Sequence, residues 1–474
     1  MTTGPEPRPP AGVPAAATQA GDIQARWGWV EGSVWTARML TALEDGVKGG
    51  VWYALMDKVY RRANLWSAWL KVQANHGAAG IDGQSVTRFA EQAERQVDEL
   101  AEQLRAGTYV PAALRRTYLP KPGSPTPRPL GIPAVRDRIV QGALRHVLEP
   151  IFERAFAASS YGFRPGRQAQ DALRHVEALL RQGHVWVVDA DLRSYFDTIP
   201  HAGLLARVRE RVADGRVLTL LEALLHTDIL EEGKRWTPAA GTPQGGVISP
   251  LLANVYLNPL DHLLAGQGFA MVRYADDFVV LCRTATEAQA ALRLIQEWTA
   301  TAGLALHPEK TRLVNLGEAG ARFEFLGYCY CRLDDGRLDH WPRPKSLQKL
   351  KDRLRHLTPR QSGLSLADTI RQTNRVLRGW FAYFRHSNRW TFPRLDQWLR
   401  TRLRSLLRHR SHRRGRGRGY DHQRWPNAFF AAQGLYSLAT AHAAAVQPTW
   451  WDSPSGEPDA GDPPVRFGGR GGAT

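Results

Sequence analysis

The sequence predicts an α+β fold, and three observations lead to that class. The tetrapeptide YADD at residues 274–277 lies between two short apolar runs, as expected for the turn of a β-hairpin. The β-branched and aromatic run at residues 185–188 predicts a strand that leads into Asp191. Amphipathic patterns predict helices over residues 137–156, 168–181 and 249–265.

Acidic side chains gather where these predicted strands end. Asp276 and Asp277 are adjacent in the hairpin turn, and Asp191 follows the strand at 185–188. Adjacent carboxylates repel each other unless a cation lies between them, and carboxylate oxygens suit Mg²⁺. A surface turn with two aspartates and no metal is the competing interpretation. A third carboxylate at a second strand end favours the metal site, with Asp191, Asp276 and Asp277 as ligands of two Mg²⁺ ions.

Several motifs occur in an order that identifies a family resemblance. Residues 191–197, 241–254 and 274–277 resemble the ordered palm motifs of reverse transcriptases. More narrowly, the chain resembles bacterial group II intron reverse transcriptases with a maturase domain. Further stretches that fit this family lie at residues 75–83, 128–133, 136–141, 160–166, 304–311 and 325–328. The resemblance spans about residues 50 to 445 and implies a right-hand polymerase with fingers and palm followed by an α-helical thumb.

The chemistry of such a polymerase indicates which side chains would hold a nucleotide. Lys121 and Arg128 flank a proline-rich, hairpin-like loop and would neutralise a triphosphate, since Arg can bind phosphate oxygens in a bidentate manner. The resemblance implies that Phe196 packs beneath the sugar and excludes a 2′-hydroxyl. Gln244 and Gly245 allow close backbone approach to the nucleotide or template base.

Lys310 is a candidate to protonate the leaving pyrophosphate. Each of the other positions has an alternative interpretation. Phe196 could be a core residue, Gln244 and Gly245 could form an ordinary glycine turn, and the loop from Lys121 to Arg128 could be a simple proline-rich connector. Asp189 and Asp197 are interpreted as structural.

From about residue 346 onward the pattern is helical, and basic residues gather near its end. Residues 374–384 resemble the thumb or maturase domain of the same family, which implies binding of intron RNA through Arg375 and Arg378. Residues 400–424 contain ten arginines and three histidines. The alternating Gly-Arg run with Arg413, Arg414, Arg416 and Arg418 is suited to following phosphates, although a solubilising basic loop is the alternative.

The composition agrees with a polyanionic partner. Lys and Arg total 63 against 45 Asp and Glu, giving a net charge of +18, but charge alone does not distinguish RNA from DNA or a membrane surface. The three cysteines include no CxxC pair, and Cys329 and Cys331 are interpreted as core residues on one face of a strand rather than zinc ligands. No apolar stretch reaches the roughly 18 residues of a membrane span, and we expect a cytoplasmic bacterial protein.

For a chain of 474 residues we expect two or three domains. The predicted divisions are a disordered tail at 1–25, fingers and palm at 26–340 with an amino-terminal extension at about 50–110, a helical thumb at 341–400, a basic region at 401–451 and a tail at 452–474. Many relatives continue into an HNH nuclease with paired cysteines, which this sequence does not show. We therefore expect no endonuclease, and a primer made elsewhere, such as at a replication fork.

The leading hypothesis is an RNA-directed DNA polymerase that binds intron RNA as template and splicing partner, with a DNA primer or target and dNTPs as further partners. An RNA-binding maturase with a vestigial polymerase and a stand-alone defence reverse transcriptase are the two alternatives. The intact set of acidic and basic site residues favours the active enzyme over a maturase with a vestigial polymerase. The maturase-like segment argues against a stand-alone defence reverse transcriptase.

Overall fold

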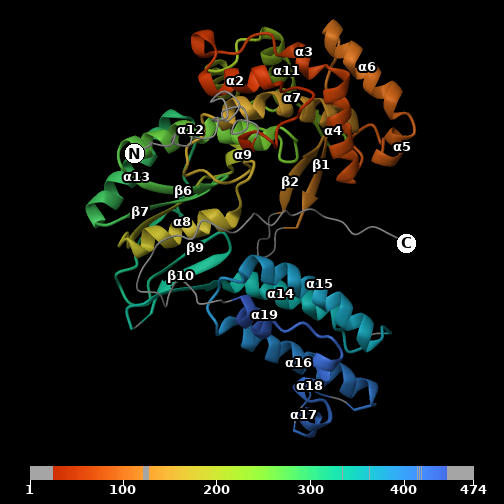
Figure 1. Cartoon of the computed structure of the whole chain (residues 1–474), viewed down its shortest axis with the longest axis vertical. Helices are drawn as coiled ribbons and strands as arrows, with labels where there is room; N and C mark the ends of the chain where they lie inside the picture. Colours follow the sequence, from red (N-terminus) through yellow and green to blue (C-terminus); the bar gives the residue numbers. More distant parts are fainter. Residues whose placement is uncertain are drawn as a thin grey trace, which may run out of the picture. The chain divides into compact units, whose positions relative to one another are not determined.

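The computed structural model describes residues 25–445 except 121–126, 334, 362, 414, 416 and 418. It divides into two compact units, Met1–Lys345 and Ser346–Thr474. Helices and both parallel and antiparallel strand pairs occur in the first unit, and the described part of the second is helical, which confirms the α+β class (Figure 1). No described helix is long and apolar enough to cross a membrane.

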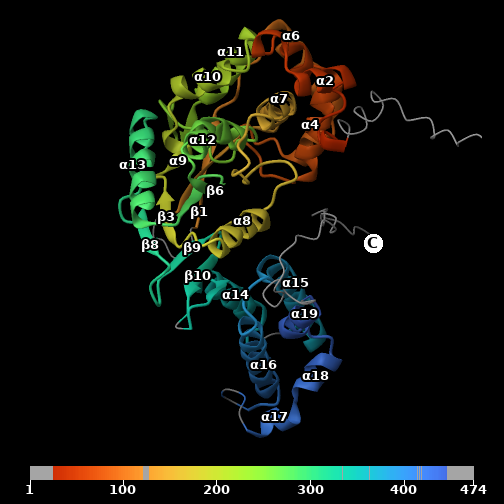
Figure 2. The same ribbon diagram turned by 60° about the vertical axis from the view of Figure 1, so that its left-hand side comes forward.

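A four-stranded sheet carries the acidic residues. Its order is β6-β7-β3-β8, and each strand is antiparallel to its neighbours. The strands are β3 (Trp186–Asp191), β6 (Ala270–Tyr274), β7 (Asp277–Cys282) and β8 (Arg312–Asn315). Helices α8 (Ala169–Arg181), α12 (Ser249–Gly266) and α13 (Ala285–Thr301) pack on this sheet (Figure 2). Strands β3, β6 and β7 and helices α8 and α12 each begin or end within a few residues of the predicted bounds, whereas α13 and β8 were not predicted.

A second sheet has the order β2-β1-β4-β5. The strands β1 (Leu114–Leu119) and β2 (Arg128–Ile132) form an antiparallel pair, as expected for a hairpin, and β1 is parallel to β4 (Ile229–Glu231). Strand β5 (Lys234–Trp236) completes the sheet at the far edge. Most of the proline-rich loop between β1 and β2, including Lys121, lies outside the described residues.

The amino-terminal part of the first unit is helical and surrounds one long buried helix. Helix α7 (Val135–Glu153) is buried along most of its length, and α4 (Arg62–Ala74) packs against it. The other helices of this part are α2 (Ala37–Asp45), η1 (Lys48–Gly50), α3 (Met56–Val59), α5 (Val86–Ala90) and α6 (Ala93–Ala106). Three further helices of the first unit follow β3 in the chain: α9 (Tyr195–Thr198), α10 (His201–Arg209) and α11 (Gly215–Leu225). The glycine-rich stretch 77–83 separates α4 from α5, as the sequence predicts.

A third sheet of three antiparallel strands ends the first unit. Its strands are β9 (Arg322–Phe325), β10 (Tyr328–Arg332) and β11 (Leu338–Pro342), with β10 in the middle. Leu326 and Gly327 both have positive φ angles, which suits the two-residue turn between β9 and β10. Cys329 and Cys331 are buried, form no disulfide and lie two residues apart on β10, as predicted for core cysteines.

The second unit is built from helices around one apolar core. The helices are α14 (Pro344–Leu357), α15 (Leu366–Phe384), α16 (Thr391–Arg410), α17 (Tyr420–Arg424), α18 (Asn427–Ala432) and α19 (Leu438–Ala445). Leu399 and Leu403 lie in the same core on either side of the predicted boundary at 400/401. That boundary falls within α16, which runs through it without a break and buries residues on both sides of it.

Candidate active site

The predicted acidic residues lie at one end of the first sheet. In the antiparallel pair of β3 and β7, Asp191 lies directly opposite Asp277. Residues directly opposite in such a pair have Cα atoms about 4.5–5.5 Å apart and side chains on the same face. Asp189, two residues before Asp191, shares that face. Asp276 lies in the turn between β6 and β7.

Buried polar contacts fix the turn that carries Asp276. The Arg273 guanidinium, fully buried on β6, donates to the backbone oxygen of Ala275 at 2.8 Å and to Asn254 Oδ1 at 2.8 Å. The same guanidinium forms a bidentate pair with Asp261, with N–O distances of 2.5 and 2.7 Å. Asn254 also donates to the backbone oxygen of Gly162 at 2.8 Å. One buried cation therefore links the acidic turn to helix α12.

The backbone of the turn requires close packing as well. Ala275 has φ +61, in the left-handed region that costs an alanine about 1 kcal/mol or more. A Cβ on Gly162 would lie 2.3 Å from the Ala275 backbone nitrogen, so only glycine fits there. The segment before Gly162 pairs with β6 through hydrogen bonds at Ser159 and Tyr161. The surrounding structure thus holds the turn in a conformation that its own sequence does not favour.

The carboxylates influence one another's protonation. Burial, followed by Asp189, Asp276 and Asp191, raises the pKa of Asp277 to about 7. The Asp277 side chain is exposed to solvent, however, so burial is the weaker explanation. Repulsion from the three neighbouring carboxylates is the better physical cause of the raised pKa. Burial is also the largest cause that raises the pKa of Asp276, with Asp191 adding to it and Arg128 opposing it. This concentration of negative charge suits a cation.

Two cations already contact this group of carboxylates. Lys310 Nζ lies 2.7 Å from Asp191 Oδ2, and Arg312 Nε lies 3.0 Å from Asp189 Oδ2. The Asp191–Lys310 pair is half exposed on both sides, so it contributes only about 0–1 kcal/mol. Asp191 can therefore exchange this partner for another cation at little cost.

Within the part of the chain that the structure describes, no three His, Cys, Asp or Glu side chains converge closely enough to form a ready-made metal site. The backbone brings the acidic residues together, but Asp189 and Asp191 are turned towards Arg312 and Lys310. The donor set itself fits a divalent metal ion, because it offers only hard carboxylate oxygens.

The predicted nucleotide-binding residues come from three neighbouring segments. Gln244 Nε2 donates to Asp197 Oδ2 at 3.0 Å, and the Gln244 backbone oxygen accepts from Gly131 of β2 at 2.8 Å. Phe196, on α9, has its backbone oxygen bonded to Thr242. Gly245 has φ +116 and lies against Gly131, where a Cβ would approach the carbonyl oxygen to 2.7 Å. The loop at 241–246 is thereby placed between β2 and the α9 turn that follows Asp191.

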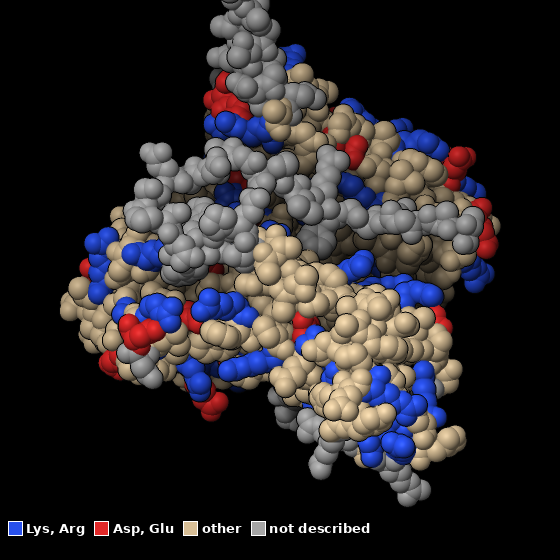
Figure 3. Space-filling view, turned by 60° about the horizontal axis from the view of Figure 1, so that its bottom comes forward, with Lys and Arg blue, Asp and Glu red and all other residues tan. Residues whose placement is uncertain are grey.

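The remaining predicted residues have different positions. Arg128 begins β2 and is near enough to Asp276 to lower the pKa of that carboxyl, whereas Lys121 is outside the described residues. Arg375 and Arg378 are exposed on α15, and Arg413 is exposed just after α16. Arg414, Arg416 and Arg418 lie outside the described residues. Figure 3 shows more Lys and Arg (blue) than Asp and Glu (red) on the face it draws.

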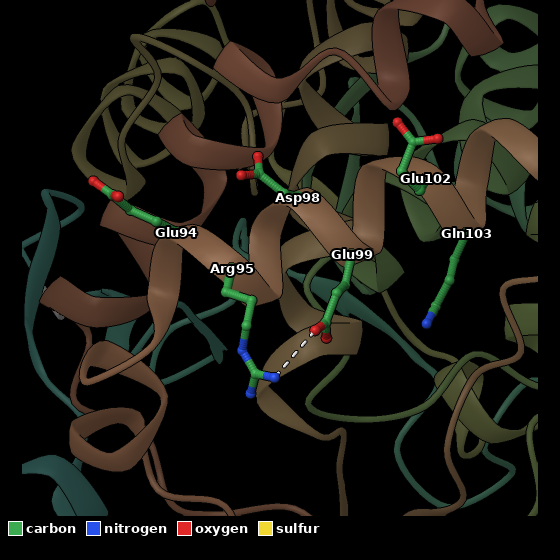
Figure 4. A pocket seen from close by; sticks show the side chains of 6 residues that line it. All are labelled: Glu94, Arg95, Asp98, Glu99, Glu102 and Gln103. Atoms are coloured by element: carbon green, nitrogen blue, oxygen red, sulfur yellow. Dashed lines mark ion pairs between the residues drawn. The ribbon is translucent and has the colours of Figure 1, made fainter.

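A hollow beside α6 is unrelated to these residues. Its lining comes from that helix alone: Glu94, Arg95, Asp98, Glu99, Glu102 and Gln103 (Figure 4). Arg95 is ion-paired with Glu99 at 3.5 Å. Four carboxylates on one helix face would repel a phosphate, so the hollow does not suit a nucleotide.

The positioning set of Arg273, Asp261 and Asn254 was not predicted from the sequence. A signal was present, because Arg273 interrupts the apolar run that leads into the turn. A charged residue that is buried within an apolar strand must find a buried partner, but the sequence does not say that this partner is Asp261, twelve residues earlier on a helix.

Comparisons with known proteins agree with this geometry. Residues 119–330 match the family described as "Reverse transcriptase (RNA-dependent DNA polymerase)", and residues 347–425 match "Group II intron, maturase-specific domain". Protein YkfC of Escherichia coli is 35% identical over 291 residues, which cover 52% of this chain and 74% of that protein. The Group II intron-encoded protein LtrA of Lactococcus lactis is 35% identical over 211 residues, which cover 44% of this chain and 34% of that protein.

A solved structure, the "Partial Cas6-RT-Cas1--Cas2 complex", matches 52% of this chain and 41% of that one with 27% identity and a TM-score of 0.35, which is too low to add to the assignment. The matched domains imply catalysis that depends on a divalent metal and binding of an RNA template. The predicted resemblance is confirmed: the chain belongs to the family of group II intron reverse transcriptases with a maturase domain, which are RNA-directed DNA polymerases.

Proposed function

We propose that the chain copies intron RNA into DNA with Asp191, Asp276 and Asp277 as the metal-binding carboxylates. The observation that carries this proposal is the register that pairs Asp191 with Asp277 next to the turn at Asp276. The group that these residues would hold is a pair of Mg²⁺ ions, which supplies activation of the primer 3′-hydroxyl and neutralisation of charge on the reacting phosphate. Asp189 stays with Arg312 and supports the strand end.

The neighbouring residues bind and orient a deoxynucleoside triphosphate. Arg128, with Lys121, neutralises the phosphates, and Phe196 lies under the sugar. Gln244 and Gly245 bring the loop backbone close to the base pair, since Gly131 and Asp197 hold that loop in place. Lys310, released from Asp191, donates a proton to the leaving pyrophosphate.

The helical unit binds the intron RNA. The exposed Arg375, Arg378 and Arg413, together with Arg414, Arg416 and Arg418, contact phosphates, which assists folding and splicing of the RNA. A DNA primer or target end completes the substrate set and supports intron mobility. We place this activity in the cytoplasm.

Substitution Asp276→Ala tests the proposal. We expect primer extension on an RNA template with Mg²⁺ to fall by at least about a thousandfold, the scale on which removal of a catalytic group acts. Binding of the same RNA should change less than about twofold, because the carboxylate serves the metal and not the template. The exposed Asp98 on α6 gives a matched control, and Asp98→Ala should extend primers normally.

Undiminished synthesis by Asp276→Ala would exclude the assigned site. Absence of synthesis by the unsubstituted protein, with RNA binding retained, would instead favour the maturase with a vestigial polymerase.

A further inference from the structure

One tryptophan of the helical unit lies within a group of cations. Lys351 Nζ lies 5.9 Å from the centroid of the Trp398 ring, and the guanidinium carbons of Arg355 and Arg402 each lie 5.6 Å from it. Lys351 and Arg355 are one turn apart on α14, and Trp398 and Arg402 are one turn apart on α16. We call Lys351, Arg355 and Arg402 the Trp398 cluster.

The positive charges of the cluster are not balanced by the neighbouring carboxylates that the structure describes. Within the described parts of the chain, Asp352 is the one carboxylate that forms an ion pair with a member, and it pairs with Arg355. Arg402 instead donates to the Thr358 hydroxyl and backbone oxygen, at 3.0 and 2.9 Å. Burial, then Arg355 and Arg360, lowers the pKa of Arg402, which shows that these cations repel one another.

Holding repelling cations together is unfavourable unless a polyanion neutralises them. Arg402 is fixed by Thr358, and the indole face restrains the stems of its neighbours, so their orientation is preorganised. Arginine forks match phosphate oxygens in pairs. The cluster also lies inside residues 347–425, which match the maturase-specific domain, and this supports RNA as the polyanion.

We propose that the Trp398 cluster binds the phosphate backbone of single-stranded RNA. This inference rests on the proposed function and adds an RNA contact on α14 and α16 to those proposed on α15 and in the Gly-Arg run. Because phosphate oxygens are the same in every nucleotide, we expect binding by the cluster to be largely independent of RNA sequence. It strengthens attachment of the RNA and takes no part in nucleotide addition.

The test compares two double variants of the full chain. Lys351→Gln/Arg355→Gln removes two charges from the cluster. The control Arg88→Gln/Arg95→Gln removes two exposed charges from α5 and α6, of which Arg95 lies beside the carboxylates drawn in Figure 4. Each protein is titrated with a single-stranded oligouridine RNA, and with a DNA duplex of equal length, at several salt concentrations. Thermal melting confirms that both variants are folded.

For the cluster variant we expect RNA affinity near physiological salt to fall about tenfold, and the slope of log K against log salt to fall by about 1.4, since each lost phosphate contact on a single strand removes about 0.7. The control should match the unsubstituted protein. Salt dependence that is unchanged in the folded cluster variant would overturn the inference. An equal loss in the control, or a loss confined to duplex DNA, would also overturn it.

The two proposals fail in different ways. If the cluster variant binds RNA with an unchanged slope while the unsubstituted protein extends primers, only the inference about the cluster is lost. If the unsubstituted protein neither binds the RNA nor extends a primer, the proposed function is lost with it.

Discussion

At the scale of single residues, the acidic turn depends on the buried Arg273 guanidinium, which has no proposed role in the chemistry itself. Arg273 satisfies Asp261, Asn254 and the Ala275 carbonyl at once, all in the buried interior. A buried ion pair of this kind is costly to break, at about 3–5 kcal/mol when one partner is removed, because the other charge is left unpaired. Arg273 is therefore a positioning residue for Asp276.

Substitution Arg273→Lys separates positioning from simple folding. Lysine keeps the charge beside Asp261, but its single ammonium group lacks the planar fork that reaches Asn254 and Ala275 together. We expect the protein to fold and to bind RNA, while kcat for primer extension falls about 10- to 100-fold and the Mg²⁺ concentration for half-maximal rate rises. Steady-state extension over a Mg²⁺ series measures both.

The conservative change Arg174→Lys is the control for that experiment, because Arg174 is an exposed arginine of α8 that is ion-paired with Asp171 and not with the carboxylates of the site. If the Arg273→Lys variant kept an unaltered Mg²⁺ requirement and full kcat, the guanidinium would serve stability alone.

At the scale of elements, helices α4 and α7 are joined by a buried polar network. His146 on α7 bonds to Asn64 Oδ1 at 2.8 Å, and its Nε2 lies 2.7 Å from Lys71 Nζ. Asn64 donates to the backbone oxygens of Lys58 and Ala143, so its side-chain oxygen must accept from the imidazole. The imidazole is then neutral, with its proton on Nδ1 and its Nε2 accepting from the ammonium.

This network predicts a loss of stability in mild acid. Burial, then Lys71, lowers the pKa of His146 to about 4 from an ordinary value near 6.5. Because the folded state disfavours protonated His146, the contribution of the neutral imidazole to the free energy of unfolding is complete above pH 6.5. This contribution is lost as the pH falls towards 4. The total loss in the free energy of unfolding over this pH range is about 3 kcal/mol. Thermal midpoints between about pH 7.5 and about pH 5 should fall more steeply for the native chain than for His146→Gln.

The exposed His76 provides the comparison, and His76→Gln should keep the steep dependence. Identical pH profiles for His146→Gln and the native chain would mean that the imidazole is not held neutral by this contact.

At the scale of the whole molecule, the proposed catalytic carboxylates and the proposed RNA-binding arginines of α15 belong to separate compact units. The carboxylates lie in the first unit, and the exposed Arg375 and Arg378 lie in the second. The net charge of +18 makes binding of any nucleic acid strongly dependent on salt. The two functions should therefore respond to different substitutions.

The variant Arg375→Gln/Arg378→Gln tests this separation. Loss of two phosphate contacts should lower the salt slope of RNA binding by about 1.4, while the Mg²⁺ requirement of primer extension stays as in the native chain. Extension assays at saturating RNA, with binding titrations in parallel, measure both quantities. A shift in the Mg²⁺ requirement would show that the helical unit influences the carboxylates.

The sequence by itself determined the α+β class, the strands that end at Asp191 and Asp277, and the family, because these depend on local periodicity and on motifs read in order. Only the tertiary structure decided which residues hold the turn. Arg273, Asp261, Asn254 and Gly162 are brought together by packing between distant segments, and no local pattern specifies such contacts. The same applies to the helical unit, where packing joins residues on both sides of Arg400 in one core, because contacts between helices are not specified by local sequence.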